Sequence, residues 1–246
     1  MTEPRPSFTL DGVEVPFSPG ESVVTAARAA GHYIPTLCFH REFAAHGSCK
    51  VCTIEVNGRH ATGCTTPARA GDVIAARTPT LDEQRRELVQ FLFTEGNHFC
   101  PSCEQSGDCT LQAVGAELGV TTGHYNPLFP TRPLDASHPD VILERNRCIL
   151  CELCVRASAQ VDGKHVFALS GRGIGKHLIV NAESGRLADT ELAATDKAMA
   201  VCPVGALLRK RRGFAVPIGQ RTFDRQTVAE HAIAPAAPAA PPREEA

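Results

Sequence analysis

Residues 34–64 read IPTLCFHREFAAHGSCKVCTIEVNGRHATGC and place four cysteines around a predicted β-hairpin. These are Cys38, Cys49, Cys52 and Cys64, spaced C-x10-C-x2-C-x11-C. Four thiolates are the ligand set of a [2Fe–2S] cluster, and a C-x2-C pair lets one loop present two sulfurs. A structural zinc site uses the same donors and is the alternative that the spacing leaves open.

The residues on either side of this stretch predict a small α+β unit. Asp11-Gly12 and Asn57-Gly58 each separate two short strand-like segments, which is typical of hairpins. Ser22 is a suitable cap for a helix that ends at Gly31, and residues 71–74 predict a closing strand. Apolar residues then recur at helical spacing over 81–93, where we expect an amphipathic helix.

The second cysteine group is one ligand short. Cys100, Cys103 and Cys109 follow the pattern C-x2-C-x5-C, whereas a [4Fe–4S] cluster takes four ligands. His98 lies two residues before the first of these cysteines, and a neutral imidazole can bind iron. A lone histidine beside a turn is seldom a ligand, but beside an incomplete triad it is the best candidate. We therefore expect these four residues to hold a [4Fe–4S] cluster.

The third group is half of a bacterial ferredoxin motif. Cys148, Cys151 and Cys154 form C-x2-C-x2-C, and the cysteine expected four residues later is replaced by Ser158. Cys202, which is followed by a proline, supplies the remaining ligand. Its own upstream partners would fall at 192, 195 and 198, where there are no cysteines, so only one [4Fe–4S] cluster is predicted here.

Composition supports metal binding over disulfides. The chain has 246 residues, 11 cysteines and a net charge of -2, and its N-terminus does not resemble a secretion signal. An odd cysteine count suits disulfides poorly, and the three ligand sets use every cysteine, which leaves no thiol for catalysis. Near-neutral charge disfavours nucleic acid as a partner, and no apolar run is long enough for a membrane span. We expect a cytoplasmic protein without catalytic residues of its own.

Several quoted stretches resemble one family. IPTLCFH, GSCKVCTIEVNG and Cys64 are similar to the N-terminal [2Fe–2S] domain of the complex I large iron–sulfur subunit. The same domain opens some [FeFe]-hydrogenases and the diaphorase iron–sulfur (U) subunit of soluble, bidirectional NAD-reducing [NiFe]-hydrogenases. EGNHFCPSCEQSGDCTLQA, residues 95–113, resembles the motif that uses one histidine and three cysteines. Complex I usually has three residues between that histidine and the first cysteine; here Phe99 stands alone, as in the diaphorase subunits.

This resemblance implies a fold and a division into domains. The fold class is α+β, with a β-grasp [2Fe–2S] ferredoxin domain (1–80) and a helical segment holding the histidine-ligated [4Fe–4S] cluster (81–120). A linker (121–138) and a bacterial-ferredoxin-like [4Fe–4S] domain (139–215) follow. Residues 216–246 are expected to be a docking segment with a disordered Ala/Pro-rich tail beyond Ala232, and KRRGFAVPIGQRTFD, 210–224, resembles the end of the diaphorase subunit.

The resemblance also implies a function. The chain would relay electrons between a flavoprotein that holds FMN and NAD and the small and large subunits of a hydrogenase. It would be part of that oxidoreductase without turning over a substrate alone. The same relay in a formate dehydrogenase or a complex I-like NADH dehydrogenase is the alternative. A zinc-binding interaction protein is the alternative of a different class.

Two sequence features are weaker candidates. Residues 171–176 look like a phosphate-binding loop, but His177 stands where that motif has Ser or Thr. A glycine-rich turn between strands at 166–170 and 177–180 is the better interpretation. The basic run 209–212 is expected to be a solvated face.

Overall fold

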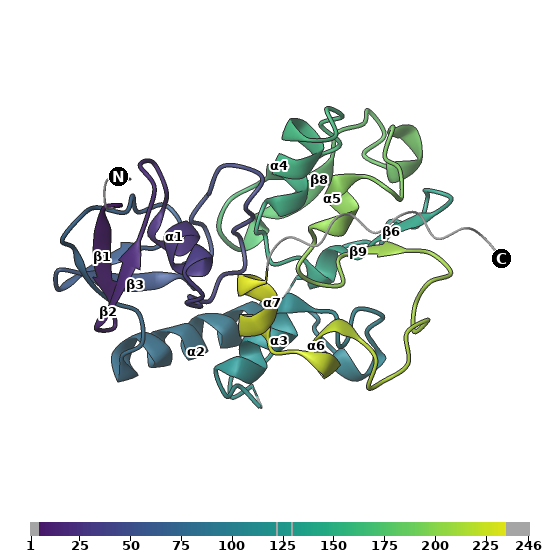
Figure 1. The fold of residues 1–246 in the computed structure, drawn as a ribbon. Helices are drawn as coiled ribbons and strands as arrows, with labels where there is room; N and C mark the ends of the chain where they lie inside the picture. Colours follow the sequence, from purple (N-terminus) through teal and green to yellow (C-terminus); the bar gives the residue numbers. More distant parts are fainter. Residues whose placement is uncertain (1–4, 122, 129, 235–246) are drawn as a thin grey trace.

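The N-terminal strands form one mixed sheet in the computed structural model, which describes residues 5–121, 123–128 and 130–234. They are β1 (Ser7–Leu10), β2 (Val13–Pro16), β3 (Thr53–Val56), β4 (Arg59–Thr62) and β5 (Val73–Ala75), in the order β2-β1-β5-β3-β4. β5 lies between the two hairpins, parallel to β1 and antiparallel to β3. Helix α1 (Val23–Ala29) shares a buried core with the sheet, which completes the predicted β-grasp fold (Figure 1).

Local sequence accounts for these elements. Asp11 and Gly12 both have positive φ angles, 48° and 85°, which the two-residue turn of such a hairpin requires. Asn57 and Gly58 do the same in the second hairpin, at 50° and 77°. The side chain of Ser22 accepts a hydrogen bond from the first turn of α1 and caps it. Both hairpins and the helix cap are therefore confirmed.

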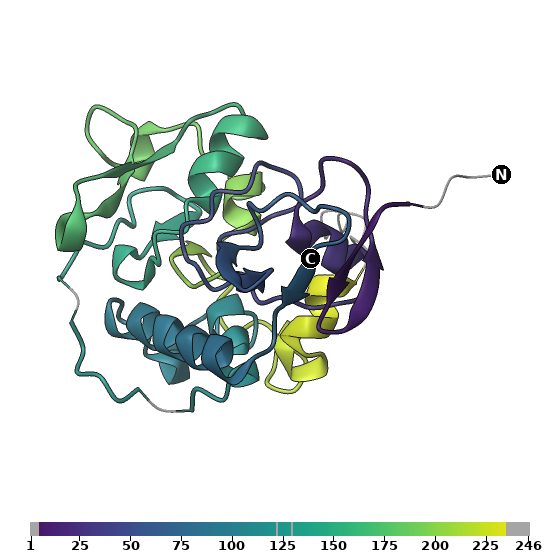
Figure 2. The ribbon, with the colours of Figure 1, turned by 90° about the vertical axis from the view of Figure 1, so that its left-hand side faces the viewer.

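A second group of helices lies along one side of this domain. They are α2 (Pro79–Thr94), α3 (Thr110–Glu117), α6 (Thr222–Arg225) and α7 (Val228–Ile233). α2 confirms the amphipathic helix and begins two residues earlier than predicted, because the side chain of Thr78 caps it. α7 packs against both α3 and α1, so the C-terminal part of the chain returns to the N-terminal domain (Figures 1 and 2).

The remaining elements form a third unit with two small antiparallel ribbons. These elements are β6 (Val141–Leu143), α4 (Leu153–Gln160), β7 (Phe167–Ser170), β8 (His177–Val180), α5 (Lys197–Ala200) and β9 (Leu207–Arg209). β6 pairs with β9, and β7 pairs with β8. Residues 171–176 form the turn between β7 and β8, so the interpretation as a glycine-rich turn is confirmed.

The segment expected to be a linker is fixed to the third unit at its end. The carboxylate of Asp135 is buried and accepts hydrogen bonds from the N–H of Leu187 at 2.8 Å and from Ser137. His138 is also buried, with Nε2 2.8 Å from the carbonyl of Leu192. The tail predicted to be disordered lies, from residue 235 on, outside the described residues.

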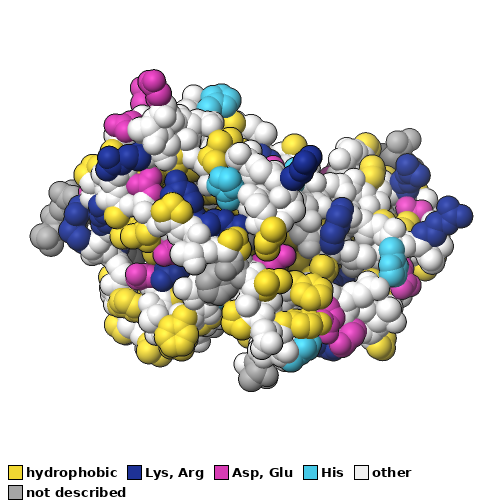
Figure 3. All heavy atoms as spheres, turned by 180° about the vertical axis from the view of Figure 1, so that it is seen from behind, with side chains coloured by type: hydrophobic (Ala, Val, Ile, Leu, Met, Phe, Trp, Pro, Cys, Tyr) yellow, Lys and Arg dark blue, Asp and Glu magenta, His cyan; other side chains and the backbone are white. Residues whose placement is uncertain are grey.

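The face of the molecule shown in Figure 3 has no single dominant charge. On the face shown in Figure 3, acidic and basic side chains are interspersed, and hydrophobic side chains gather at its lower left. This agrees with the net charge of -2. Within the described ranges, every helix is too short or too polar to cross a lipid bilayer.

Candidate iron–sulfur centres

The first cysteine group comes together beside the β-grasp sheet. Cys38, Cys52 and Cys64 are buried, and Cys49 is half-buried. The thiols contact one another in the pairs 38–49, 38–64 and 52–64. Hydrogen bonds from the thiols of Cys49 and Cys64 lower the pKa of Cys38, so the group favours a thiolate. All four predicted ligands therefore meet at one site.

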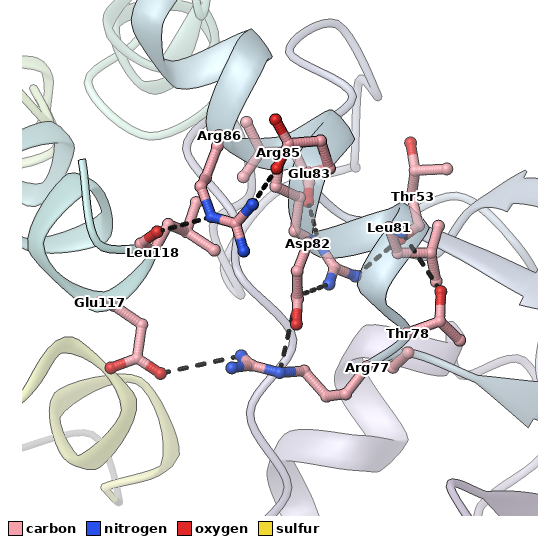
Figure 4. Close-up of polar contacts among 12 residues, drawn as sticks. Thr53, Arg77, Thr78, Leu81, Asp82, Glu83, Arg85, Arg86, Glu117 and Leu118 are labelled. Carbon is pink, nitrogen blue, oxygen red and sulfur yellow. Dashed lines mark hydrogen bonds and ion pairs between the residues drawn. The ribbon is translucent and has the colours of Figure 1, made fainter. Parts of the chain in front are cut away.

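Helix α2 fixes the backbone of this site through a buried arginine. Nε of Arg85 donates to the carbonyl of Val51 at 3.1 Å, and one terminal nitrogen donates to Thr53 at 2.7 Å (Figure 4). These two carbonyls lie on either side of Cys52 in the chain. The other terminal nitrogen pairs with Asp82 at 2.9 Å, which offsets the cost of burying the charge.

The second group forms where α3 begins. The sulfur of Cys109 accepts a hydrogen bond from the backbone N–H of Gln112 and so caps α3. Burial raises the pKa of Cys109 to about 12, with smaller contributions from the charges of Cys100 and Cys103. The three thiols are thus close enough to interact electrostatically. A Cβ added at Gly205 would lie 2.8 Å from the sulfur of Cys103, so only glycine fits there.

His98 has the properties of an unused ligand. Its Nε2 is buried and has no hydrogen-bond partner within the described part of the chain. Burial, together with the positive charge of Arg147, lowers the pKa of His98 to about 4, so the imidazole is neutral near pH 7. A buried nitrogen without a partner costs free energy unless something binds it. Iron bound by Cys100, two residues away, would provide that partner.

The third group lines a single small cavity. Cys148, Cys151, Cys154 and Cys202 all face it. Burial raises the pKa of each of these thiols, and that of Cys148 reaches about 11. The distant cysteine predicted as fourth ligand is therefore placed with the other three. Ser158 is buried too, and its hydroxyl accepts a hydrogen bond from the N–H of Val166 at 2.9 Å, a purely structural contact.

Left-handed backbone recurs between the cysteines of the closely spaced pairs. Lys50, Leu150 and Glu152 have φ angles of 57°, 55° and 61°. Such residues turn successive N–H groups toward one side and make a cradle for anions. The N–H of Leu150 indeed points to the sulfur of Cys148 at 3.4 Å. Strained backbone of this kind is kept where it serves a site.

Donor type and placement fit iron–sulfur clusters. The thiols of the three groups and the unpartnered imidazole nitrogen of His98 provide the twelve predicted donors. The third group of thiols lines a cavity of its own. Among the described residues, no three His, Cys, Asp or Glu side chains converge as a single metal ion would require. The assignment therefore rests on chemistry and contacts, and the individual ligands stay a prediction.

Three arginines that hold the cluster-binding loops were not predicted from the sequence. Arg85, Arg147 and Arg156 all donate to backbone carbonyls of these loops or their neighbours. Arg147 also forms an ion pair with Glu104 at 2.7 Å, beside the second group. An arginine directly before Cys148 was a visible signal, but the other two contact residues far away in the sequence. Of the basic run, Arg211 pairs with Asp140.

Three protein families account for most of the chain. A 2Fe-2S iron-sulfur cluster binding domain matches residues 5–79. The NADH-ubiquinone oxidoreductase-G iron-sulfur binding region matches residues 85–124, and a 4Fe-4S single cluster domain matches residues 141–208. Both cluster types that the cysteine spacing predicts are thus present as domains.

Known proteins resemble the chain over most of its length. The gamma subunit of the NAD-reducing hydrogenase HoxS of Cupriavidus necator is 39% identical over 92% of this chain and 96% of its own. The 78 kDa subunit of mitochondrial NADH-ubiquinone oxidoreductase of Neurospora crassa is 30% identical, but the match spans only 29% of that protein. Among solved structures, a chain of an NAD+-reducing [NiFe]-hydrogenase in the H2-reduced state is 52% identical, with a TM-score of 0.88 over 90% of this chain and 94% of that one.

Proposed function

We propose, from the premise that the chain belongs to the family of NAD-reducing hydrogenase gamma subunits, that it relays electrons inside such an enzyme. The observation that carries the proposal is the meeting of the three cysteine groups. Three cysteines pack at the edges of the same two hydrophobic cores: Cys49 of the first group, and Cys148 and Cys202 of the third. Cys109 of the remaining group lies in one of these cores. The sites are therefore neighbours.

The residues of the chain divide the work of a relay. When bound, iron–sulfur clusters supply one-electron oxidation and reduction. Cys38, Cys49, Cys52 and Cys64 would hold one [2Fe–2S] cluster. His98 with Cys100, Cys103 and Cys109, and Cys148 with Cys151, Cys154 and Cys202, would each hold one [4Fe–4S] cluster. The surrounding apolar cores exclude water and fix the separation of the sites.

The partners follow from the family. A flavoprotein with FMN and NAD would exchange electrons with one end of the relay, and the small and large hydrogenase subunits with the other. The same sites would serve equally in a formate dehydrogenase or a complex I-like NADH dehydrogenase. Co-expression with each candidate set of subunits, followed by co-purification, separates these assignments. A location in the cytoplasm belongs to the same proposal.

Metal analysis of the anaerobically purified chain tests the proposal. Two, four and four irons sum to about ten per chain, with about ten acid-labile sulfides. The EPR spectrum of the reduced protein should show three centres. His98→Ala should disturb one [4Fe–4S] signal and spare the others. His124→Ala is the control, because this histidine is exposed and its Nε2 lies 3.7 Å from Glu87, away from the cysteines.

Two outcomes would count against the proposal. Stoichiometric zinc with little iron in fresh protein would contradict the proposal that the chain relays electrons, and would favour a zinc-binding protein instead. About six irons would mean that one [4Fe–4S] assignment is wrong, and the histidine site would be the first suspect.

A further inference from the structure

The loops of the first and third cysteine groups touch across a common seam. Cys38 and Phe43 from the first loop belong to the same buried core as Cys151 and Cys154 from the third. Polar contacts between side chains cross the seam as well. Lys197 of α5 pairs with Glu42 at 2.7 Å, and Nε2 of His46 lies 3.2 Å from a carboxylate oxygen of Glu152. Two cluster-binding loops more than 100 residues apart in sequence therefore form one interface.

Arg156 of α4 occupies the centre of this seam. One terminal nitrogen of its guanidinium donates to the carbonyl of Cys38 at 2.7 Å and to the carbonyl of Cys151 at 3.3 Å. The other terminal nitrogen donates to the backbone carbonyl of Ala44 at 2.5 Å, and Nε donates to the backbone carbonyl of Glu152 at 3.3 Å. The guanidinium carbon lies 5.2 Å from the ring centre of Phe43. A single nitrogen thus bridges two predicted ligands of different clusters.

The charge of Arg156 has no carboxylate partner within ion-pair distance in the part of the chain that the structure describes. The nearby carboxylate of Glu152 faces His46 and Lys176, and that of Glu42 faces Lys197. A half-buried positive charge is only weakly screened by water. Because its guanidinium donates to the carbonyls of Cys38 and Cys151, this charge lies beside a predicted ligand of each site.

We propose that Arg156 is a positioning residue shared by the first and third cluster sites. Its fork fixes the distance between the loops of Cys38 and Cys151, and its positive charge raises the reduction potential at both sites. Cluster potentials respond to nearby charge and hydrogen bonding, and reduction adds negative charge that a cation stabilises. The second site, which Arg147 accompanies, is outside this influence. The proposal rests on the proposed function, since it presumes clusters at both sites.

Two substitutions in the full chain, purified anaerobically with its clusters, separate charge from geometry. Arg156→Gln removes the charge, so the reduction potentials of both sites should fall. We expect a fall of about 59 mV, which corresponds to a tenfold change in a one-electron reduction equilibrium. The potential at the histidine site should not move. Arg156→Lys keeps the charge but loses the fork, so both potentials should stay near wild type while the magnetic interaction between the two reduced centres changes. EPR-monitored redox titration measures all of these quantities.

Arg86→Gln is the matched control, because Arg86 also donates to a backbone carbonyl, that of Leu118, and pairs with Glu83, and neither partner belongs to the two loops. It should leave all three potentials unchanged. A shift confined to one site, no shift, or an equal shift at all three sites in Arg156→Gln would overturn the proposal. If that variant loses iron, Arg156→Lys decides: an unaltered magnetic interaction overturns the proposal. Wild-type protein without iron would overturn the proposed function too, whereas about ten irons with unmoved potentials would overturn only the role of Arg156.

Discussion

At residue scale, Gly96 makes room for the imidazole of His98. A Cβ built on Gly96 would lie 2.5 Å from Nε2 of His98, far inside van der Waals contact. The ring therefore occupies the space that a side chain at 96 would enter. Position 96 is also where the longer spacing of the complex I motif would place its histidine. A single residue, Phe99, separates His98 from Cys100, and Gly96 leaves space beside the ring. Together these features explain how the imidazole of His98 can occupy the place of a histidine at 96.

Gly96→Ala should therefore weaken the second site without unfolding the chain. The new methyl group must push the ring of His98 aside, which removes the predicted fourth ligand. We expect the iron content to fall toward that of His98→Ala, with the other two EPR signals intact. Gly123→Ala is the control, since a Cβ there would meet nothing within 4 Å. Full iron content in Gly96→Ala would show that the ring can move without loss of the site.

At the scale of elements, α2 supports the first site through a single side chain. Arg85 is 1% exposed, and its donors reach the carbonyls on both sides of Cys52 as well as Asp82. Removing it leaves buried carbonyls without partners, and each unsatisfied group costs about 1–3 kcal/mol. The helix and the cluster-binding loop therefore depend on each other.

Arg85→Met should lower the free energy of unfolding by about 3 kcal/mol, since two buried carbonyls and one ion pair lose their partner. The visible absorbance of the [2Fe–2S] centre should bleach at a lower urea concentration than in wild type. Arg86→Met, one residue along on the same helix, should cost less, because it loses one part-buried carbonyl contact, to Leu118, and an exposed ion pair with Glu83. Equal urea midpoints for the two variants would refute the supporting role of Arg85.

Local patterns predicted the elements whose determinants lie close together in sequence. The two hairpin turns, the cap of α1 and the periodicity of α2 are of this kind. Helix α3 escaped prediction because its cap is Cys109, which the spacing had already assigned to a cluster. α4 begins directly after the left-handed Glu152 and has no side-chain cap. Its start depends on the loop that holds the third site.

The sequence predicts candidate ligands for each site, which stay a prediction, but it does not predict the side chains that support them. Cysteine spacing predicts most of the grouping, and the structure brings the first and third groups together, the distant Cys202 included. The partners of Arg85 and Arg156 lie 34 and 118 residues away for their contacts with Val51 and Cys38. Only the folded chain reveals these pairs.

At the scale of the whole molecule, the predicted ligands sit where the cores join. Cys49, Cys148 and Cys202 border two hydrophobic cores at once. Burial raises the pKa of Cys148 to about 11 and that of Cys109 to about 12, so these thiols are protonated near pH 7 without iron. Iron must displace those protons to bind, and metal binding in such sites contributes directly to folding. The stability of the fold should therefore rise and fall with the cluster content of the protein.

Oxidative removal of iron under chelation should destabilise the entire chain, not only its loops. We expect trypsin to digest the iron-free protein at least about tenfold faster, because binding free energy that stabilised the fold is lost. Rebinding should improve as pH rises through neutrality, since each thiol must lose its proton to bind iron. Protein treated with chelator but without oxidant keeps its iron and serves as the control. If the iron-free chain resists trypsin as well as the control, the cores hold together without clusters, and cluster binding does not contribute to the stability of the fold.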